Sequence, residues 1–256
     1  MKAATEELLY VLLWGAENLM RPSFHRLNES FETWSYRKGL LHQIAELERR
    51  KLLERKPSKS AERIYRLTPT GRLVALGGID PPTRWNREWD GRWRIVAFDL
   101  PEKENAARVR LRRLLKDRGF GYLQNSFWIT PDPLDTPIAR LAAKGQDVES
   151  FVTLEAMPCS GESNQARVAG AWNFEGINER YEFLMSWLQR PPSVGRGQDA
   201  SSEELQQWAR EEKRRWQSAI SVDPFLPAEL LPKNYLGRKA WNLRGRVLGR
   251  AGGWLS

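Results

Sequence analysis

The chain has 256 residues, which is enough for two or three domains, and no apolar run approaches the ~20 residues that cross a bilayer. Lysine and arginine outnumber aspartate and glutamate by 41 to 32, and the resulting net charge of +9 favours a polyanionic partner, nucleic acid first. One cysteine, Cys159, excludes an internal disulfide and a cysteine-based zinc finger, and two histidines are too few for an ordinary His-metal site. We therefore expect a soluble, cytoplasmic protein with no metal, no enzymatic cofactor and no membrane association.

Residues 1–80 are predicted to form a winged helix-turn-helix domain, because three helical segments precede a two-stranded ribbon and a further helix. The best defined of the three helices follows Ser35. Its apolar residues recur at helical spacing, at Tyr36, Leu40, Ile44 and Leu47. Short strands are expected over 52–56 and 63–67, after which Thr68-Pro69 supplies an N-cap and a first-turn proline for the next helix.

Positive charge is concentrated in residues 35–66, which hold ten basic and four acidic side chains. In a winged helix the third helix enters the major groove, and cations around it contact phosphates. We therefore assign Arg37, Lys38 and His42 to the groove. The residues expected to contact the DNA backbone, from the helix end and the wing, are Arg49, Arg55, Lys56, Lys59 and Arg63. The alternative is a solvated basic helix on a domain that binds protein.

Residues 81–157 are predicted to form a ferredoxin-like domain. The expected elements are, in chain order, strand 94–98, helix 105–118, strand-like residues 122–130, helix 134–143 and strand 151–154. This β-α-β-β-α-β order is typical of a ferredoxin-like sandwich, and it makes the chain an α+β protein.

The helix over 105–118 is rich in cations. They are Arg108, Arg110, Arg112, Arg113, Lys116 and Arg118. One interpretation is an RNA-binding surface, and the other is a solvated outer face over the sheet. We favour the second, since charge runs on helices mostly face solvent.

Residues 158–256 are predicted to form a mainly helical domain, with helices over 177–189, 201–220 and 237–249. The polar segment 190–200 is rich in proline and glycine and is expected to be a mobile linker. Farther along, three prolines suit a fixed, extended connection in a dimer or interdomain contact: Pro224, Pro227 and Pro232.

Three stretches of the chain carry a family resemblance. They are Tyr65-Arg66-Leu67-Thr68-Pro69-Thr70-Gly71-Arg72, then Trp89-Asp90-Gly91-Arg92-Trp93-Arg94 continuing through Phe98-Asp99-Leu100-Pro101-Glu102 to Trp128-Ile129-Thr130-Pro131, and Asp223-Pro224-Phe225-Leu226-Pro227-Ala228-Glu229-Leu230-Leu231-Pro232. The first is common to many winged-helix regulators, and the other two are more specific. Together they resemble the PaaX-type repressors of phenylacetic acid degradation operons.

The resemblance implies an N-terminal winged helix, a central domain similar to small CRISPR-associated nucleases, a C-terminal helical domain, homodimerisation and control by an acyl-CoA. The stretch 41–47 keeps the apolar spacing of the family's recognition helix but lacks its two arginines. We predict a DNA-binding transcriptional regulator that is not an enzyme: a homodimeric repressor of a catabolic operon that responds to an aryl- or acyl-CoA.

Two other functions stay open. In the CRISPR-associated nucleases, an acidic residue at the end of the first strand is tied to metal-dependent cleavage, and Asp99 matches that position. A single carboxylate is weak evidence for such a site, so we favour a structural role for Asp99. The second alternative is a protein-binding adaptor that has lost DNA binding.

Overall fold

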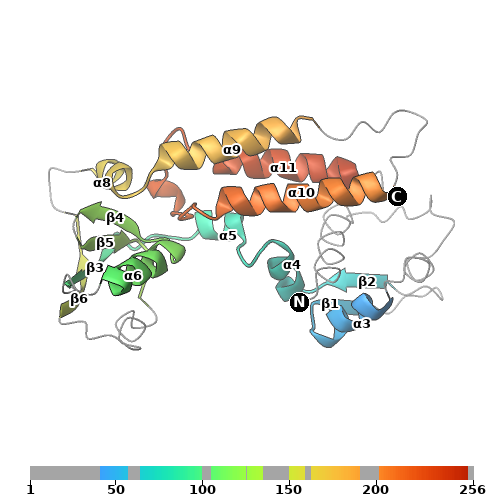
Figure 1. Ribbon diagram of the computed structural model, residues 1–256, viewed down its shortest axis with the longest axis horizontal. Helices are drawn as coiled ribbons and strands as arrows, with labels where there is room; N and C mark the ends of the chain where they lie inside the picture. Colours follow the sequence, from blue (N-terminus) through green and yellow to red (C-terminus); the bar gives the residue numbers. More distant parts are fainter. Residues whose placement is uncertain are drawn as a thin grey trace. The chain divides into compact units, whose positions relative to one another are not determined.

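The described part of this computed structural model comprises residues 41–56, 64–99, 105–124, 126–134, 150–158, 163–190 and 202–252 (Figure 1). It divides into two compact units. The first draws on residues 41–80, 185–217 and 239–252, and the second on 81–184 and 218–238. No helix in these ranges has the length and apolar character needed to cross a membrane. The three-domain division that we predict at residues 80 and 157 stays a prediction.

The first unit contains the predicted strand pair and the helix that follows it. Its elements are α3 (Leu41–Arg49), β1 (Leu53–Lys56), β2 (Ile64–Leu67) and α4 (Pro69–Ala75). Ile44 and Leu47 of α3 are buried, as their spacing predicts, and β1 pairs antiparallel with β2. The two helices expected before α3 lie outside the described residues.

Thr68 caps α4, as the sequence predicts, and it also ties α4 to the end of α3. Its Oγ1 accepts a hydrogen bond from the Gly71 backbone N at 2.9 Å and donates one to the Lys51 carbonyl at 2.7 Å. Gly71 lies so close to this junction that a Cβ built on it would be 1.9 Å from the Leu52 carbonyl oxygen. Only a residue without a side chain fits there.

A four-stranded antiparallel sheet forms the centre of the second unit. Its elements are β3 (Trp93–Asp99), α6 (Asn105–Asp117), β4 (Gly121–Gln124), β5 (Phe127–Thr130) and β6 (Ser150–Ala156), and the strand order is β4-β5-β3-β6. The strand-like residues 122–130 contain two strands, β4 and β5, which pair with each other, in agreement with the two consecutive strands of the predicted order. The second helix that we expect, over 134–143, lies almost wholly outside the described residues.

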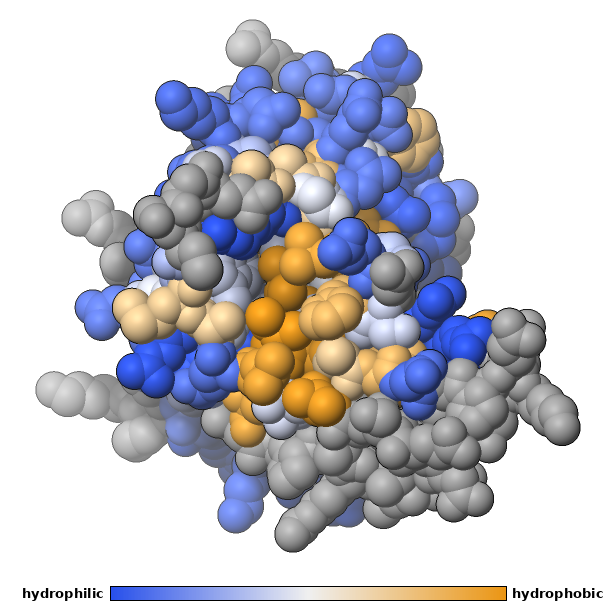
Figure 2. Space-filling model, turned by 90° about the vertical axis from the view of Figure 1, so that its left-hand side faces the viewer, coloured by the Kyte–Doolittle hydropathy of each residue, from blue (hydrophilic) through white to orange (hydrophobic). Residues whose placement is uncertain are grey.

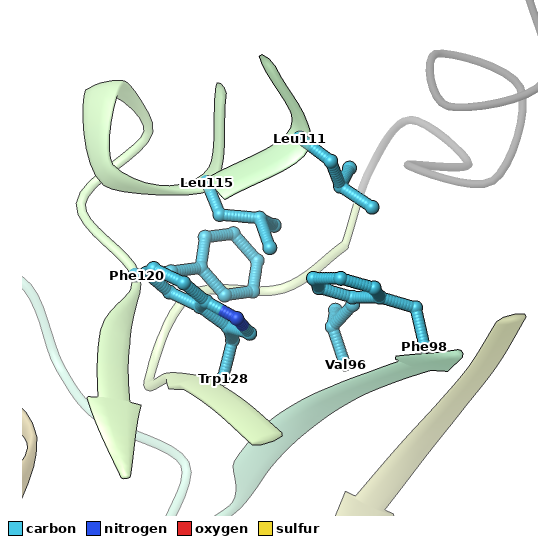
Figure 3. Packing of buried hydrophobic residues seen from close by; sticks show 6 residues of the cluster. All are labelled: Val96, Phe98, Leu111, Leu115, Phe120 and Trp128. Atoms are coloured by element: carbon cyan, nitrogen blue, oxygen red, sulfur yellow. The ribbon is translucent and has the colours of Figure 1, made fainter. Parts of the chain in front are cut away.

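One face of this sheet packs against α6. Figure 3 shows Leu111 and Leu115 of the helix pointing toward side chains of β3 and β5. The buried cluster comprises Val96, Phe98, Leu111, Leu115, Phe120 and Trp128. Because Leu111 and Leu115 face the sheet, the opposite side of α6 faces solvent.

Among the described residues, the cover of the opposite face lies at the end of the sheet where β4 runs. There α8 (Asn164–Ala171) and Trp172 approach β4, and a Cβ on Gly121 would lie 2.6 Å from the Trp172 ring and 2.7 Å from the Ala171 side chain. Trp93 reaches the same Trp172, with ring centroids 6.1 Å apart. Since residues alternate between the two faces of a strand, the side chains of Phe127, Val152 and Leu154 lie on this face, where they remain exposed.

The remaining elements are helical. They are α5 (Pro81–Trp85), α9 (Phe174–Leu188), α10 (Ser202–Ile220), the short 3-10 helix η3 (Ala228–Leu230) and α11 (Gly237–Gly252). The structure confirms the three helices predicted for the C-terminal region, with small shifts at their ends. The linker that we expect over 190–200 lies outside the described residues except for Arg190.

In the second unit a buried carboxylate joins distant segments. Asp223 Oδ2 accepts hydrogen bonds from the hydroxyls of Tyr181 and Tyr235, each at 2.5 Å, and Oδ1 accepts one from the Phe225 backbone N at 2.7 Å. Burial raises the pKa of Asp223, against the effect of its three donors. Phe225 and Leu226 are buried in this unit, so the proline-rich segment packs within its own chain.

In the first unit, by contrast, the buried charge is paired. Arg244 Nε of α11 donates to Glu212 Oε1 of α10 at 2.7 Å, and both side chains are almost fully buried. The guanidinium carbon also lies 4.6 Å from the ring centroid of Trp216 and 5.7 Å from that of Trp241. Two helices and two indole rings thus enclose one ion pair.

Candidate nucleic-acid interface

Two predicted DNA contacts, His42 and Arg49, lie on the outward side of α3. Ile44 and Leu47 bury the inner side of the helix, and this leaves His42, Ala45 and Arg49 exposed. The Arg49 side chain is 73% exposed, and its Nη2 lies 3.8 Å from Glu46, which is a loose contact. Arg49 therefore presents a charge that a phosphate can take up.

Arg55 differs from Arg49, because it lies on the side of the hairpin that meets α3. The register pairs Leu53 with Leu67 and Arg55 with Tyr65, so all four side chains share one face of the two strands. Arg55 Nε is 3.4 Å from Glu48 of α3, and its guanidinium lies 5.8 Å from the centroid of the Tyr65 ring. Arg55 therefore links the hairpin to the helix, and its predicted contact with DNA stays a prediction.

Of the other predicted DNA contacts, Lys56 is the one that the structure describes. Lys56 is the last residue of β1, at the end nearest the tip of the hairpin. The remaining four lie outside the described residues: Arg37, Lys38, Lys59 and Arg63. What the structure brings together is therefore the outward side of α3 and the base of the hairpin.

Three exposed cations in this region were not among the predicted contacts. Arg50, Lys51 and Arg66 are all exposed, and Arg66 lies across the hairpin from Glu54. Arg50 Nη2 is 2.7 Å from Glu46, so part of its charge is already balanced. All three fall in the basic stretch 35–66, and helical spacing alone did not show which of its residues face outward.

The nuclease alternative depends on Asp99, which the structure places at the exposed end of β3. Its neighbour across the sheet is Ser150 of β6, which is not a carboxylate. Within the described ranges, no three His, Cys, Asp or Glu side chains converge to hold a metal ion. Metal-assisted cleavage needs several such ligands around the cation.

The Trp89–Arg94 motif builds the turn that leads into β3. Arg94 is buried; its Nη2 donates to Asp90 Oδ2 at 2.6 Å, and its Nε donates to Glu155 Oε1 at 3.3 Å. The hydrogen bond from Arg94 lowers the pKa of Asp90, and the same contact raises the pKa of Arg94. Sequence reasoning missed this pairing, since Glu155 is brought to Arg94 only by the register of β3 with β6.

Comparison with known proteins covers the second part of the chain most fully. Residues 86–168 match the model of the PaaX protein central Cas2-like domain, and residues 172–250 match that of the PaaX-like protein C-terminal domain. A curated relative, the transcriptional repressor PaaX of Escherichia coli (strain K12), is 26% identical over 163 residues. That match covers 60% of this chain and 50% of the length of the relative.

A solved structure supports the fold over nearly the whole chain. The uncharacterized protein Rv0674 from Mycobacterium tuberculosis superposes with a TM-score of 0.54 at 20% identity, and the match covers 96% of this chain and 94% of that one. This likeness concerns the fold alone. The two domain models together cover more than half of the chain, and with the curated relative they place it in the PaaX family of transcriptional regulators.

Proposed function

We propose that the protein is a transcriptional repressor that binds duplex DNA through α3 and the β1–β2 hairpin, as part of a winged helix. Membership of the PaaX family supports this function, and so does the name of the curated relative. The observation that carries the proposal is the division of α3, where Ile44 and Leu47 bury one side and His42 and Arg49 are exposed on the other. A helix that is held from one side and basic on the other can enter a major groove.

The two exposed residues of α3 are expected to act differently. Replacing Arg49 by alanine removes a phosphate contact, so binding should weaken on all sequences and the slope of log K against log salt should fall by about one. Replacing His42 by alanine should cost about 1–3 kcal/mol on the preferred site and reduce the preference for it. Fluorescence anisotropy with a duplex selected from a random library, titrated at several salt concentrations, measures both effects.

The controls separate this function from its alternatives. Arg246→Ala removes an exposed cation from α11 and should leave both quantities unchanged. A wild-type protein that selects no duplex would count against DNA binding and favour the protein-binding adaptor. Cleavage of DNA or RNA with Mg²⁺ or Mn²⁺, lost in Asp99→Ala, would favour the nuclease instead.

The proposed repressor acts as a homodimer through the exposed face of the central sheet. In this proposal the sheet and α6 belong to a ferredoxin-like domain whose second helix occupies residues 134–143. The sheet face carries Phe127, Val152 and Leu154, which are 44%, 44% and 49% exposed. Figure 2 shows a hydrophobic patch on this side of the molecule. An exposed apolar patch is typical of an interaction site, and a dimer would present two reading helices to two half-sites.

A charge on the sheet face should dissociate the dimer. Phe127→Glu places a carboxylate in an apolar contact, and we expect the dimer Kd to rise about 100-fold, because an unpaired charge is costly to bury. Sedimentation equilibrium measures this change. Val109→Glu is the control, since Val109 is also an exposed apolar residue but lies on α6. If Phe127→Glu and Val109→Glu sediment alike, the dimer does not form through this face.

In this proposal a small-molecule effector controls DNA binding by the repressor. An aryl- or acyl-CoA ester is the class of ligand that the family resemblance implies, and it would act on the spacing of the two reading helices in the dimer. Adding such an ester to the repressor–DNA complex should weaken binding by tenfold or more, a coupling of about 1.4 kcal/mol. Free coenzyme A is the control, since it has the same phosphates without the acyl group.

A further inference from the structure

The outer side of α6 is a basic surface. Leu111 and Leu115 point into the core (Figure 3), and each residue of a helix turns by about 100°, so Arg113 lies opposite them, Lys116 and Arg110 lie on either side of Arg113, and Arg112 lies on the flank next to Lys116. All four side chains are exposed. We call Arg110, Arg112, Arg113 and Lys116 the α6 basic face.

The cations of the α6 basic face are neighbours of one another. Arg112 and Lys116 are four residues apart, and Arg113 is three residues from both Arg110 and Lys116, which are the spacings at which helical side chains meet. Like charges at these spacings destabilise a helix. The single acid of α6 is Asp117, whose Oδ2 lies 3.9 Å from Arg113 Nε, with side chains 69% and 84% exposed.

A solvated helix of the same chain is arranged differently. In α10, Glu211 accepts hydrogen bonds from Arg214, and its Oε1 lies 2.7 Å from Arg214 and 2.6 Å from Arg215. These arginines lower the pKa of Glu211 to about 2. Cations of α10 are thus balanced by an acid on their own helix, whereas those of the α6 basic face repel one another. An external polyanion would balance them.

We propose that the α6 basic face is a second DNA-binding surface, which contacts the phosphate backbone of duplex DNA without reading its sequence. This inference rests on the proposed function, since the reading helix supplies specificity and the α6 basic face adds affinity. Duplex DNA offers closely spaced phosphates to a row of cations. Single strands are commonly bound by stacking on aromatic rings, and α6 contains no aromatic residue.

The test compares two variants of the full chain that lose the same charge. The first is Arg112→Gln/Arg113→Gln/Lys116→Gln on α6. The second is the control Lys233→Gln/Lys239→Gln/Arg246→Gln, whose three cations are also exposed but lie outside α6. Each is titrated with a mixed-sequence duplex that lacks the selected site and with the selected duplex, over a range of salt concentrations. Thermal melting checks that both variants stay folded.

We expect the α6 variant to bind the mixed-sequence duplex about tenfold more weakly, with a salt slope lower by about two to three, because each phosphate contact contributes about 0.9. The control should keep the wild-type slope within about one. Melting of the α6 variant should be no lower than that of wild type, since like-charge repulsion is removed.

Three results would overturn the proposal, and they are distinguishable from failure of the proposed function. If wild type binds the selected duplex and the two triple variants have the same slope, the α6 basic face does not bind DNA. If wild type prefers duplex RNA of the same length and only the α6 variant loses it, the partner is RNA. If wild type binds neither DNA duplex, the repressor function fails as well.

Discussion

Replacing Glu212 by alanine is expected to destabilise the protein by about 3–5 kcal/mol, because it removes the carboxylate that is paired with the buried guanidinium of Arg244. The side chains of Glu212 and Arg244 are 0% and 3% exposed, so the ion pair lies away from bulk solvent. Denaturant titration followed by far-UV circular dichroism measures the loss as a lower unfolding midpoint.

Two further variants show whether the loss comes from burial of the charge. Glu211→Ala removes a neighbouring carboxylate of α10 that also contacts two arginines, but this carboxylate is partly exposed, so we expect a change of about 1 kcal/mol or less. Replacing both Glu212 and Arg244 by apolar residues of similar volume, Glu212→Leu with Arg244→Met, should restore most of the stability. An unchanged midpoint for Glu212→Ala would mean that Arg244 finds another partner or reaches solvent.

Gly71→Ala is expected to separate α4 from the end of α3. The new Cβ would lie 1.9 Å from the Leu52 carbonyl oxygen and 2.8 Å from the Leu52 carbonyl carbon. These are backbone atoms, so the clash cannot be relieved by rotation of a side chain. We expect a loss of about 1–3 kcal/mol or more, and weaker DNA binding, since Leu52 immediately precedes the hairpin. Thermal melting and the anisotropy assay measure the two effects.

Gly245→Ala is the matched control for this prediction. Gly245 lies in α11, and, apart from its chain neighbours and the backbone of its own helix, no atom lies within 4 Å of the position that its Cβ would take. Alanine is the better helix former there, by roughly 0.5–1 kcal/mol. If both glycine variants melt at or above the wild-type temperature, the close approach at Gly71 relaxes without cost.

Helices with a clear apolar stripe could be predicted from the sequence to within a few residues. The helix expected over 105–118 is α6 (Asn105–Asp117), and that expected over 201–220 is α10 (Ser202–Ile220). The prediction missed α8, whose eight residues include few large apolar side chains; its one local signal was Ser163, which accepts a hydrogen bond from the Ala166 backbone N. Stability of α8 comes from tertiary packing around Trp172, which spacing along the chain cannot show.

The sequence showed which charged residues lie in the candidate site, but it did not show which of them form ion pairs within the protein. Spacing along α3 correctly separated buried Ile44 and Leu47 from exposed Arg49. The same reasoning treated Arg55 as equivalent to Arg49, although the hairpin register turns Arg55 toward Glu48. Burial of Arg94 was hidden for a similar reason, because Glu155 lies 61 residues farther along the chain.

The hydroxyl of Thr68 holds the end of α3 against the start of α4, and Arg55 braces the hairpin on Glu48. None of these supporting atoms belongs to His42 or Ala45, which face away from the support. The residues that hold α3 in place are therefore different from the residues that α3 exposes. For a helix that reads DNA, this separation has a consequence for specificity. Substitution of the exposed side chains can change the preferred operator, while the supporting contacts and the stability that they provide are kept.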